Sequence, residues 1–269
     1  MPLSTKLPWP QPLSRHADLP REELRTLAKG LAAIEAFDEA HPAMTLSEVA
    51  RRTGISPGAA QRILRTLTSL GYVGSDGTRF SLRPRALQLG YAYLASLPLA
   101  AIAQPLLGAL SAQTGGSSSL AVLDEVAVVY VARSSAQALA RDYMAVGTRL
   151  PAQATSVGKV LLAALPAAER EARVARIAPD RLTPHTLADP DAIGAALDRV
   201  AAEGFALNDQ ETALGMRSIA VPVMAAGRTV AALGMSSEVV RTTLATMKEA
   251  WLPAMRATAA SIGAALAGR

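Results

Sequence analysis

The stretch that decides the fold is "ISPGAAQRILRTL", residues 55–67, which lies between two segments with helical periodicity. Ser56 is a good residue to cap a helix, and Pro57 suits the first helical position because its missing N–H is not needed there. The pattern therefore predicts a helix that begins at Pro57 and runs to Leu70, before Gly71 ends it.

Winding this helix at about 100° per residue separates its side chains into two faces. The apolar face carries Ala60, Ile63, Leu64, Leu67 and Leu70. The opposite face carries Gly58, Gln61, Arg62, Arg65 and Ser69. The first face is expected to pack and the second to be exposed. Plain packing of two helices and a helix aimed at DNA are both compatible with this stretch alone.

The preceding residues predict two further helices. Apolar residues recur every three or four positions from Glu22 to Phe37, which is typical of an amphipathic helix. In "TLSEVARRT", residues 45–53, Thr45 and Glu48 have the spacing of a capping box, and Gly54 ends the helix. Two helices joined by a short glycine-containing turn form a helix-turn-helix pattern.

The residues that follow predict a β-hairpin. In "GYVGSDGTRFSL", residues 71–82, the strand-like pieces 72–73 and 79–82 surround a "GSDG" turn. A hairpin directly after a helix-turn-helix is a wing. Capping, exposed arginines and a wing in this order favour DNA binding, whereas the alternative keeps Arg62 and Arg65 as a solvated helix face.

The positive charge of the chain gathers in this region. The net charge is +5, and residues 48–85 carry seven arginines against two acidic residues, which accounts for the whole excess. Only four basic residues of the chain are lysines, so a general bias toward arginine explains the abundance of arginine but not its clustering. Residues 99–269 carry fifteen basic and fourteen acidic residues, so electrostatics gives them no reason to touch DNA.

The pattern divides the chain into four parts. Residues 1–20 are predicted to be a flexible tail, 21–83 the winged helix-turn-helix domain, and 84–98 a linker helix that starts at Pro84. Residues 99–269 mix strand-like and helical segments and are predicted to form an effector-binding and oligomerisation domain. No apolar run is long enough to cross a bilayer, so we expect a cytoplasmic protein that does not associate with a membrane.

The residues also argue against catalysis and against a metal or cofactor. The chain has no cysteine, and its three histidines lack the spacing of metal ligands. His185, the only histidine after residue 98, lies in a polar connection without a nucleophile pattern. We therefore expect no enzyme, no metal and no cofactor.

A candidate ligand site lies in "LPAQATSVGKVLLAALP", residues 150–166. Thr155, Ser156 and Gly158 start an apolar helix, and the hydroxyls and backbone N–H groups there suit a carboxylate. Two interpretations stay open, because Thr155 and Ser156 also serve as caps and Gly158 also permits close packing.

Several long segments in the same order resemble the IclR family of bacterial transcription regulators, and within it the Pca and Pob regulators of aromatic-acid catabolism. They are "TLAKGLAAIEAFDEAHPAMTLSEVARRTGIS", "LTSLGYVGSDGTRFSLRPRALQLGYAYLASL", "SLAVLDEVAVVYVAR", "VGTRLPAQATSVGKVLLAALP" and "GMRSIAVPV". The resemblance implies an α+β architecture: a winged helix-turn-helix domain, a linker helix and a GAF-like effector domain with a mainly antiparallel sheet. It also implies a homodimer or a dimer of dimers.

The same resemblance implies which residues form the effector pocket. They are Thr155, Ser156, Val157, Gly158, Asp209, Ser218, Gly234 and Ser236. Arg133 and Arg217 are candidate partners of a carboxylate, though each also suits a structural salt bridge. Ser118, Gln153 and the stretch "NDQE" depart from the pattern of the branch.

The sequence thus predicts a transcription regulator that responds to a small organic acid, with 4-hydroxybenzoate or protocatechuate preferred, and that controls a catabolic operon. Two copies would place their recognition helices in successive major grooves of double-stranded operator DNA. Gln61, Arg62 and Arg65 are the candidates for base edges, and Ser56, Gly58 and Arg79 for phosphates. The alternative is a small-molecule-binding or enzymatic α/β protein whose N-terminal helices mediate protein association.

Overall fold

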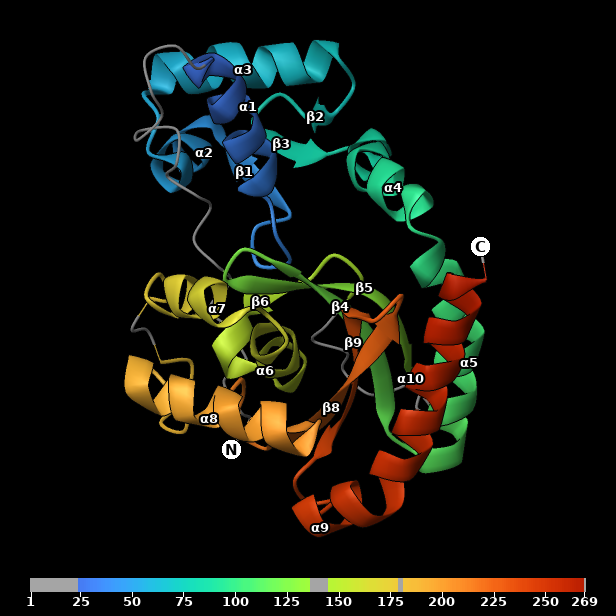
Figure 1. Ribbon diagram of the computed structural model, residues 1–269. Helices are drawn as coiled ribbons and strands as arrows, with labels where there is room; N and C mark the ends of the chain where they lie inside the picture. The colour runs from blue at the N-terminus through green and yellow to red at the C-terminus, as the bar shows by residue number, and fades with distance from the viewer. Residues whose placement is uncertain (1–23, 136–144, 179–180, 269) are drawn as a thin grey trace. The chain divides into compact units, whose positions relative to one another are not determined.

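The structure is a computed structural model that describes residues 24–135, 145–178 and 181–268 (Figure 1). The contacts divide the chain into two compact units, with the division between Ser96 and Leu97. The tail expected over residues 1–20 lies outside the described residues. Each unit is described by itself.

The helices of the N-terminal unit follow the capping signals. They are α1 (Arg25–Glu35), α2 (Leu46–Thr53) and α3 (Pro57–Ser69). Thr45 and Glu48 form the expected capping box, and Gly54 ends α2 with a φ of 68°. The Ser56 hydroxyl accepts a hydrogen bond from the Ala59 N–H, so α3 begins at Pro57 as predicted.

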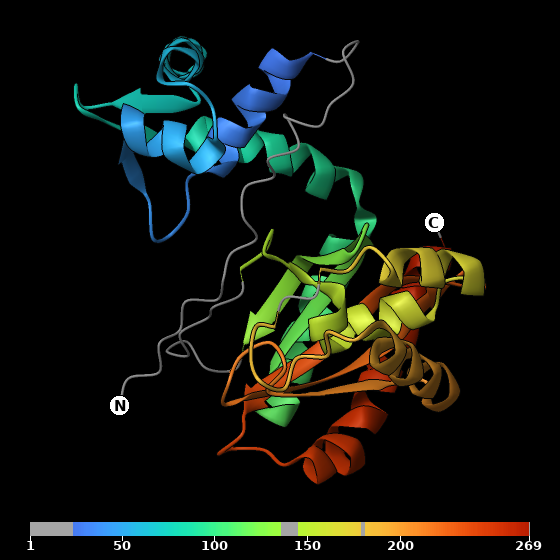
Figure 2. The ribbon, with the colours of Figure 1, turned by 90° about the vertical axis from the view of Figure 1, so that its left-hand side faces the viewer.

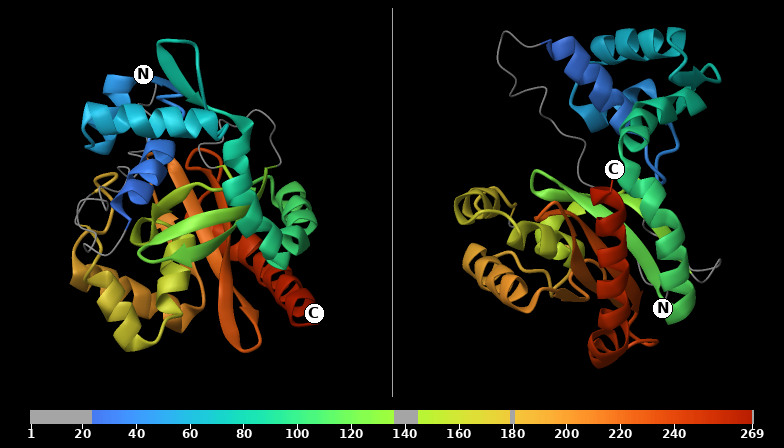
Figure 3. Two further views of the ribbon diagram at one scale, coloured as in Figure 1. Left: turned by 90° about the horizontal axis from the view of Figure 1, so that it is seen from above. Right: turned by 45° about the vertical axis from the view of Figure 1, so that its right-hand side comes forward.

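A small antiparallel sheet completes this unit. It contains β1 (Ala43–Thr45), β2 (Val73–Ser75) and β3 (Arg79–Leu82) in the order β1-β3-β2. The Asp76 carboxylate accepts from the N–H groups of Thr78 and Arg79 and so closes the turn of the hairpin. The β2–β3 hairpin projects beyond the helices of its unit (Figures 2 and 3), which confirms the predicted wing.

The core of the N-terminal unit comes from the apolar faces of the helices. Four of the predicted inner side chains of α3, Ala60, Ile63, Leu64 and Leu67, are buried and pack with residues of α1, α2 and the small sheet. The prediction was wrong for Leu70, which is 50% exposed because the helix ends at Ser69. The buried set includes Ala33, Met44, Val49, Ile63, Leu64, Leu67 and Val73. This packing fixes the orientation of α3 relative to α1, α2 and the small sheet, and so keeps its outer face on the surface of the unit.

The predicted helix from Pro84 begins with a single 3-10 turn over Pro84–Ala86 and continues as α4 (Leu87–Ser96). None of the residues of α4 is buried, although the helix is predominantly apolar. Leu87 is 76% exposed and Tyr91 is 70% exposed. An apolar helix in this state is normally covered by another element or another chain.

The C-terminal unit is built on a six-stranded antiparallel sheet in the order β6-β5-β4-β9-β8-β7. The bounds of its strands are β4 (Ser117–Asp124), β5 (Ala127–Ser135), β6 (Arg149–Pro151), β7 (Ala206–Asp209), β8 (Met216–Ala225) and β9 (Arg228–Glu238). This sheet confirms the mainly antiparallel architecture expected for the effector domain.

Helices cover both faces of this sheet (Figures 1 and 3). On one face, α5 (Pro98–Thr114) and α10 (Leu252–Ala267) lie side by side, and α10 follows a turn of α9 (Leu244–Thr246) and a π-helical segment, Met247–Trp251. On the other face lie α6 (Ser156–Ala163), α7 (Ala167–Val174) and α8 (Pro190–Glu203). The sequence pattern did not predict α5, which contains Pro105.

Among the described residues, no single helix has the length and apolar character needed to cross a membrane. The segments 84–96 and 98–114 reach that length only as a bent pair broken between them.

Candidate functional site

The outer face of α3 is free for a partner. Ser56, Gly58, Gln61, Arg62 and Arg65 are all exposed, whereas the four buried residues of α3 lie on its opposite face. Neither Arg62 nor Arg65 forms an ion pair with a described residue. The helix therefore presents one amide and two guanidinium groups, which are the groups that read adenine and guanine in a major groove.

Arg79, at the start of β3, has a structural bond in addition to the role predicted from the sequence. Its Nη2 donates to the Ala43 carbonyl at 2.6 Å and so ties the wing to β1. The side chain is exposed. A phosphate contact by Arg79 stays a prediction, and it would use the other nitrogens of the guanidinium.

A polar clamp that the sequence did not predict holds α1 against α2. Arg52 donates from Nε to the Ala36 carbonyl at 3.1 Å and from Nη2 to Asp38 Oδ2 at 2.7 Å. His41 donates its backbone N–H to Asp38 Oδ1 at 2.7 Å. Burial raises the pKa of Asp38, but the bonds from His41 and the charge of Arg52 outweigh burial and leave this pKa below its usual value.

The sheet and α6 bring several serines together in the C-terminal unit. The hydroxyls of Ser156 and Ser218 share a hydrogen bond of 2.8 Å. Ser218 is paired with Ser236, and Ser236 is paired with Ser117 on its other side. We call Ser117, Ser119, Ser156, Ser218 and Ser236 the serine cluster, because alternation along the strands puts them on the face that α6 covers.

The first turn of α6 is held tightly in place. The Thr155 hydroxyl accepts from the Gly158 N–H at 2.9 Å, so Thr155 is a cap. A Cβ on Gly158 would lie 2.1 Å from the Ala152 carbonyl oxygen, and one on Gly234 would lie 2.6 Å from Val157 Cγ1. Close packing therefore explains Gly158 and Gly234 fully.

Asp209 and Arg217 pair with each other. Arg217 Nε donates to Asp209 Oδ1 at 2.6 Å and Nη2 donates to Oδ2 at 3.3 Å. The bonds from this guanidinium hold the pKa of Asp209 below its usual value. Arg217 is also adjacent to Ser218 along β8, so it points to the opposite face of the sheet. The structure therefore separates Asp209 and Arg217 from the serine cluster.

Arg133 and Tyr130 lie on the same face as the serine cluster. Arg133 is paired with Ser119 across β4 and β5, and Tyr130 is paired with Ala121 beyond a β-bulge. Tyr130 is buried in the same core cluster as Val157 and Ala152. Its burial raises the pKa of the phenol, and the nearby charge of Arg133 opposes the rise. Sequence reasoning missed Tyr130, because nothing distinguishes it from the other residues of the apolar strand in which it lies.

A buried ion pair lies beside the cluster and was also missed. Lys159 of α6 donates to Glu211 Oε1, and both residues are more than nine-tenths buried. The Glu211 carbonyl accepts from the hydroxyls of Thr183 and Thr186. The pair therefore fastens α6 to the segment after β7 and to the connection before α8.

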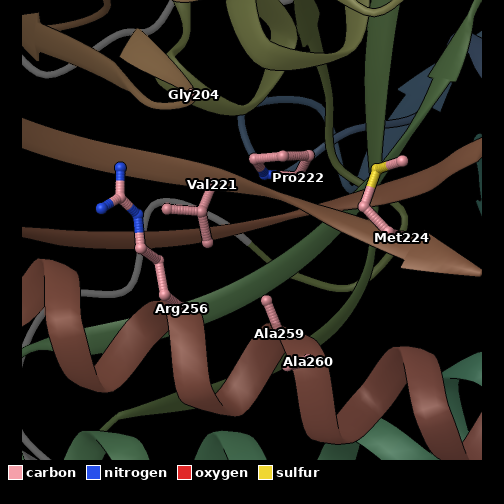
Figure 4. A pocket seen from close by; sticks show the side chains of 7 residues that line it. All are labelled: Gly204, Val221, Pro222, Met224, Arg256, Ala259 and Ala260. Atoms are coloured by element: carbon pink, nitrogen blue, oxygen red, sulfur yellow. The ribbon is translucent and has the colours of Figure 1, made fainter.

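Two shallow cavities lie away from the serine cluster. One of about 230 Å³ lies between β8 and α10, where the Arg256 side chain rises beside Val221 toward Gly204 (Figure 4). Its only charged lining group, Arg256, donates to the Glu203 carbonyl. The second, of about 200 Å³, lies between α6 and α8 and is lined mainly by alanine and valine. Neither offers the polar groups of a specific site. Among the described residues, no cluster of acidic and histidine side chains suits a metal ion.

A winged helix-turn-helix unit joined to a unit with a polar cluster inside an antiparallel sheet defines a ligand-responsive DNA-binding regulator. Residues 26–77 match the IclR helix-turn-helix domain, and residues 91–264 match the C-terminal domain of the bacterial transcriptional regulator IclR. The chain belongs to the IclR family. The members of this family to which it is similar are transcription regulators, not enzymes.

Similar proteins agree with this assignment. The Pca regulon regulatory protein of Pseudomonas putida is 40% identical over 236 residues, which cover 87% of this chain and 81% of that protein. The p-hydroxybenzoate hydroxylase transcriptional activator of Acinetobacter baylyi is 42% identical over 253 residues, covering 88% and 92%. The inducer-binding domain of PobR from Acinetobacter, solved as a double mutant with 3-hydroxybenzoic acid, is 39% identical, with a TM-score of 0.58 over 61% of this chain and 96% of that domain.

Proposed function

We propose that this chain binds operator DNA through α3 of two copies and changes its DNA affinity when a small aromatic acid binds at the serine cluster. The observation that carries the proposal is the Ser156–Ser218 hydrogen bond, which joins the start of α6 to the serines of the sheet. The DNA is a pseudo-palindromic operator of a catabolic operon, and the protein acts in the cytoplasm, where that operon lies.

The acid end of the effector fits the start of α6. The N–H groups of Ser156 and Val157 have no acceptor within the helix, because the first turn of any α-helix leaves its N–H groups unpaired. These groups and the hydroxyls of Ser156 and Ser218 can donate to a carboxylate together. Other residues of the predicted pocket have supporting parts: Thr155 caps the helix, Gly158 and Gly234 let α6 pack closely, and Ser236 extends the serine cluster.

The ring of the effector fits the apolar side chains beside the cluster. Val157 and Tyr130 belong to one buried core cluster, and Arg133 lies across from Ser119. The relatives' names support an aromatic acid, since two concern Pca and p-hydroxybenzoate regulation and one related domain holds 3-hydroxybenzoic acid. We therefore propose 4-hydroxybenzoate or protocatechuate as the effector.

Replacing Ser218 with alanine should weaken binding of 4-hydroxybenzoate about 10- to 100-fold, because the carboxylate loses one charge-assisted hydrogen bond. Isothermal titration calorimetry on the full chain measures this affinity. Ser237→Ala is the matched control. Ser237 follows Ser236 along β9, so its side chain lies on the opposite face of the sheet, where its hydroxyl accepts from Thr242. Equal losses in both variants would contradict a carboxylate site at Ser218.

We also propose that α4 packs against a second copy of the chain. Its exposed apolar residues include Leu87 and Tyr91, which are four positions apart and so share one face of the helix. The exposed leucines Leu27 and Leu31 of α1, and Leu24 directly before it, add to the uncovered apolar surface of the same unit. Covering this surface would set the spacing of two recognition helices.

The double variant Leu87→Glu/Tyr91→Glu should lower the mass of the assembly at least twofold, because two carboxylates would be buried in the contact. Sedimentation velocity measures the mass, and Gln88→Glu on the same helix controls for added charge. A double variant that keeps the wild-type mass would show that α4 is not the contact.

A further inference from the structure

Gln153 carries an unpaired buried acceptor. It lies in the 3-10 turn Ala152–Ala154, directly before α6, and is 4% exposed. Its amide oxygen Oε1 has no hydrogen-bond partner in the part of the chain that the structure describes. Buried polar atoms are nearly always paired, because an unpaired one has given up its bonds to water without replacement. Among the described residues, an acceptor in this state is open to a hydrogen bond from a ligand donor.

The turn that carries Gln153 is fixed beside the proposed effector site. The Ala152 carbonyl is in van der Waals contact with the first turn of α6 at Gly158. The Ala154 carbonyl accepts from both Asn208 Nδ2 and Thr212 Oγ1. Since both neighbours of Gln153 are held by their backbones, Gln153 is fixed in the turn that leads into α6, three positions before Ser156.

One other buried side-chain atom in the described structure is unpaired, Glu211 Oε2. Its carboxylate nevertheless has a partner, because Oε1 accepts from Lys159. The amide oxygen of Gln153, in contrast, is buried and accepts no hydrogen bond from a described residue. It is therefore the stronger candidate for contact with a ligand.

We propose that Gln153 accepts a hydrogen bond from the ring hydroxyl of the effector and so selects hydroxylated aromatic acids over unsubstituted ones. This inference rests on the proposed function. The chemistry decides which end of the ligand pairs with Gln153, because an ionised carboxylate only accepts and has no proton to give to Oε1. A phenolic hydroxyl donates, so the carboxylate lies at Ser156 and Ser218 and the hydroxyl at Gln153.

The test compares three acids on the full chain by calorimetry: 4-hydroxybenzoate, 4-fluorobenzoate and benzoate. Fluorine has nearly the size of a hydroxyl and no proton, so wild type should prefer 4-hydroxybenzoate to 4-fluorobenzoate about tenfold or more. Gln153→Met should remove this preference while benzoate affinity stays within about twofold. Gln153→Glu keeps an acceptor and should keep the preference. Gln113→Met, at an exposed position of α5, is the matched control.

The outcomes separate this inference from the proposed function. Wild type that binds all three acids equally would overturn the role of Gln153 even if Gln153→Met failed to fold. Equal weakening of all three acids by Gln153→Met would likewise make Gln153 a structural residue only. Wild type that binds none of the acids would overturn the aromatic effector itself, and the inference with it.

Discussion

Replacing Lys159 with methionine should lower the free energy of unfolding of the C-terminal unit by about 3 to 5 kcal/mol, because it leaves the Glu211 carboxylate buried without its cation. Glu211 is 8% exposed, so water cannot take over the role of Lys159. Urea unfolding followed by circular dichroism measures the change.

The double variant Lys159→Met/Glu211→Met should recover most of this loss. Apolar residues of similar volume often replace a buried ion pair at little cost, because the desolvation of both charges is avoided. A single variant as stable as wild type would mean that Lys159 and Glu211 do not depend on each other. A double variant no more stable than the single one would mean that the loss comes from packing rather than charge.

Replacing Arg62 and Arg65 together with alanine should weaken binding to the operator about 30-fold or more. Each guanidinium that contacts a guanine contributes about 1 to 3 kcal/mol of discrimination, and contacts to separate base pairs add. Fluorescence anisotropy with operator and scrambled DNA at one salt concentration measures both affinities. The operator should lose more than the scrambled sequence, because base contacts exist only there.

Arg228→Ala is the control for loss of a positive charge, since Arg228 is exposed at the start of β9 in the other unit. Single variants then assign the two positions: Arg65→Ala alone should relax specificity at one base pair. A double variant that loses equal affinity for every sequence would place both arginines on phosphates instead.

Local signals predicted the N-terminal unit well. The Thr45–Glu48 capping box, Ser56 with Pro57, and the "GSDG" turn are each set by residues within four positions, so the sequence shows them directly. Strand β1 was not predicted, because its three residues become a strand only through pairing with the distant β3. Helix α5 was missed since Pro105 interrupts its pattern, although the helix tolerates this residue.

The candidate effector site depends on contacts between distant residues, which single-sequence patterns do not show. Ser156 and Ser218 are 62 positions apart, and Lys159 and Glu211 are 52 apart. The resemblance to the family implied that Ser218 and Ser236 belong to the pocket, but it did not show on which face of the sheet they lie. Strand alternation in the structure separates Ser218 from Arg217, which pairs with Asp209 instead. The sequence marked Gln153 only as a departure from the pattern of the branch, whereas its burial and its unpaired oxygen appear only in the structure.

The most direct test of the account is the binding of the full chain to the DNA upstream of its own gene, measured by anisotropy against scrambled DNA at fixed salt, with and without 4-hydroxybenzoate and protocatechuate. The upstream DNA should bind at least about a thousandfold more tightly than the scrambled DNA. One of the acids should shift this affinity by about 5- to 150-fold. Equal, salt-sensitive binding to both DNAs would contradict a sequence-specific regulator, and selective binding that neither acid shifts would contradict the aromatic effector.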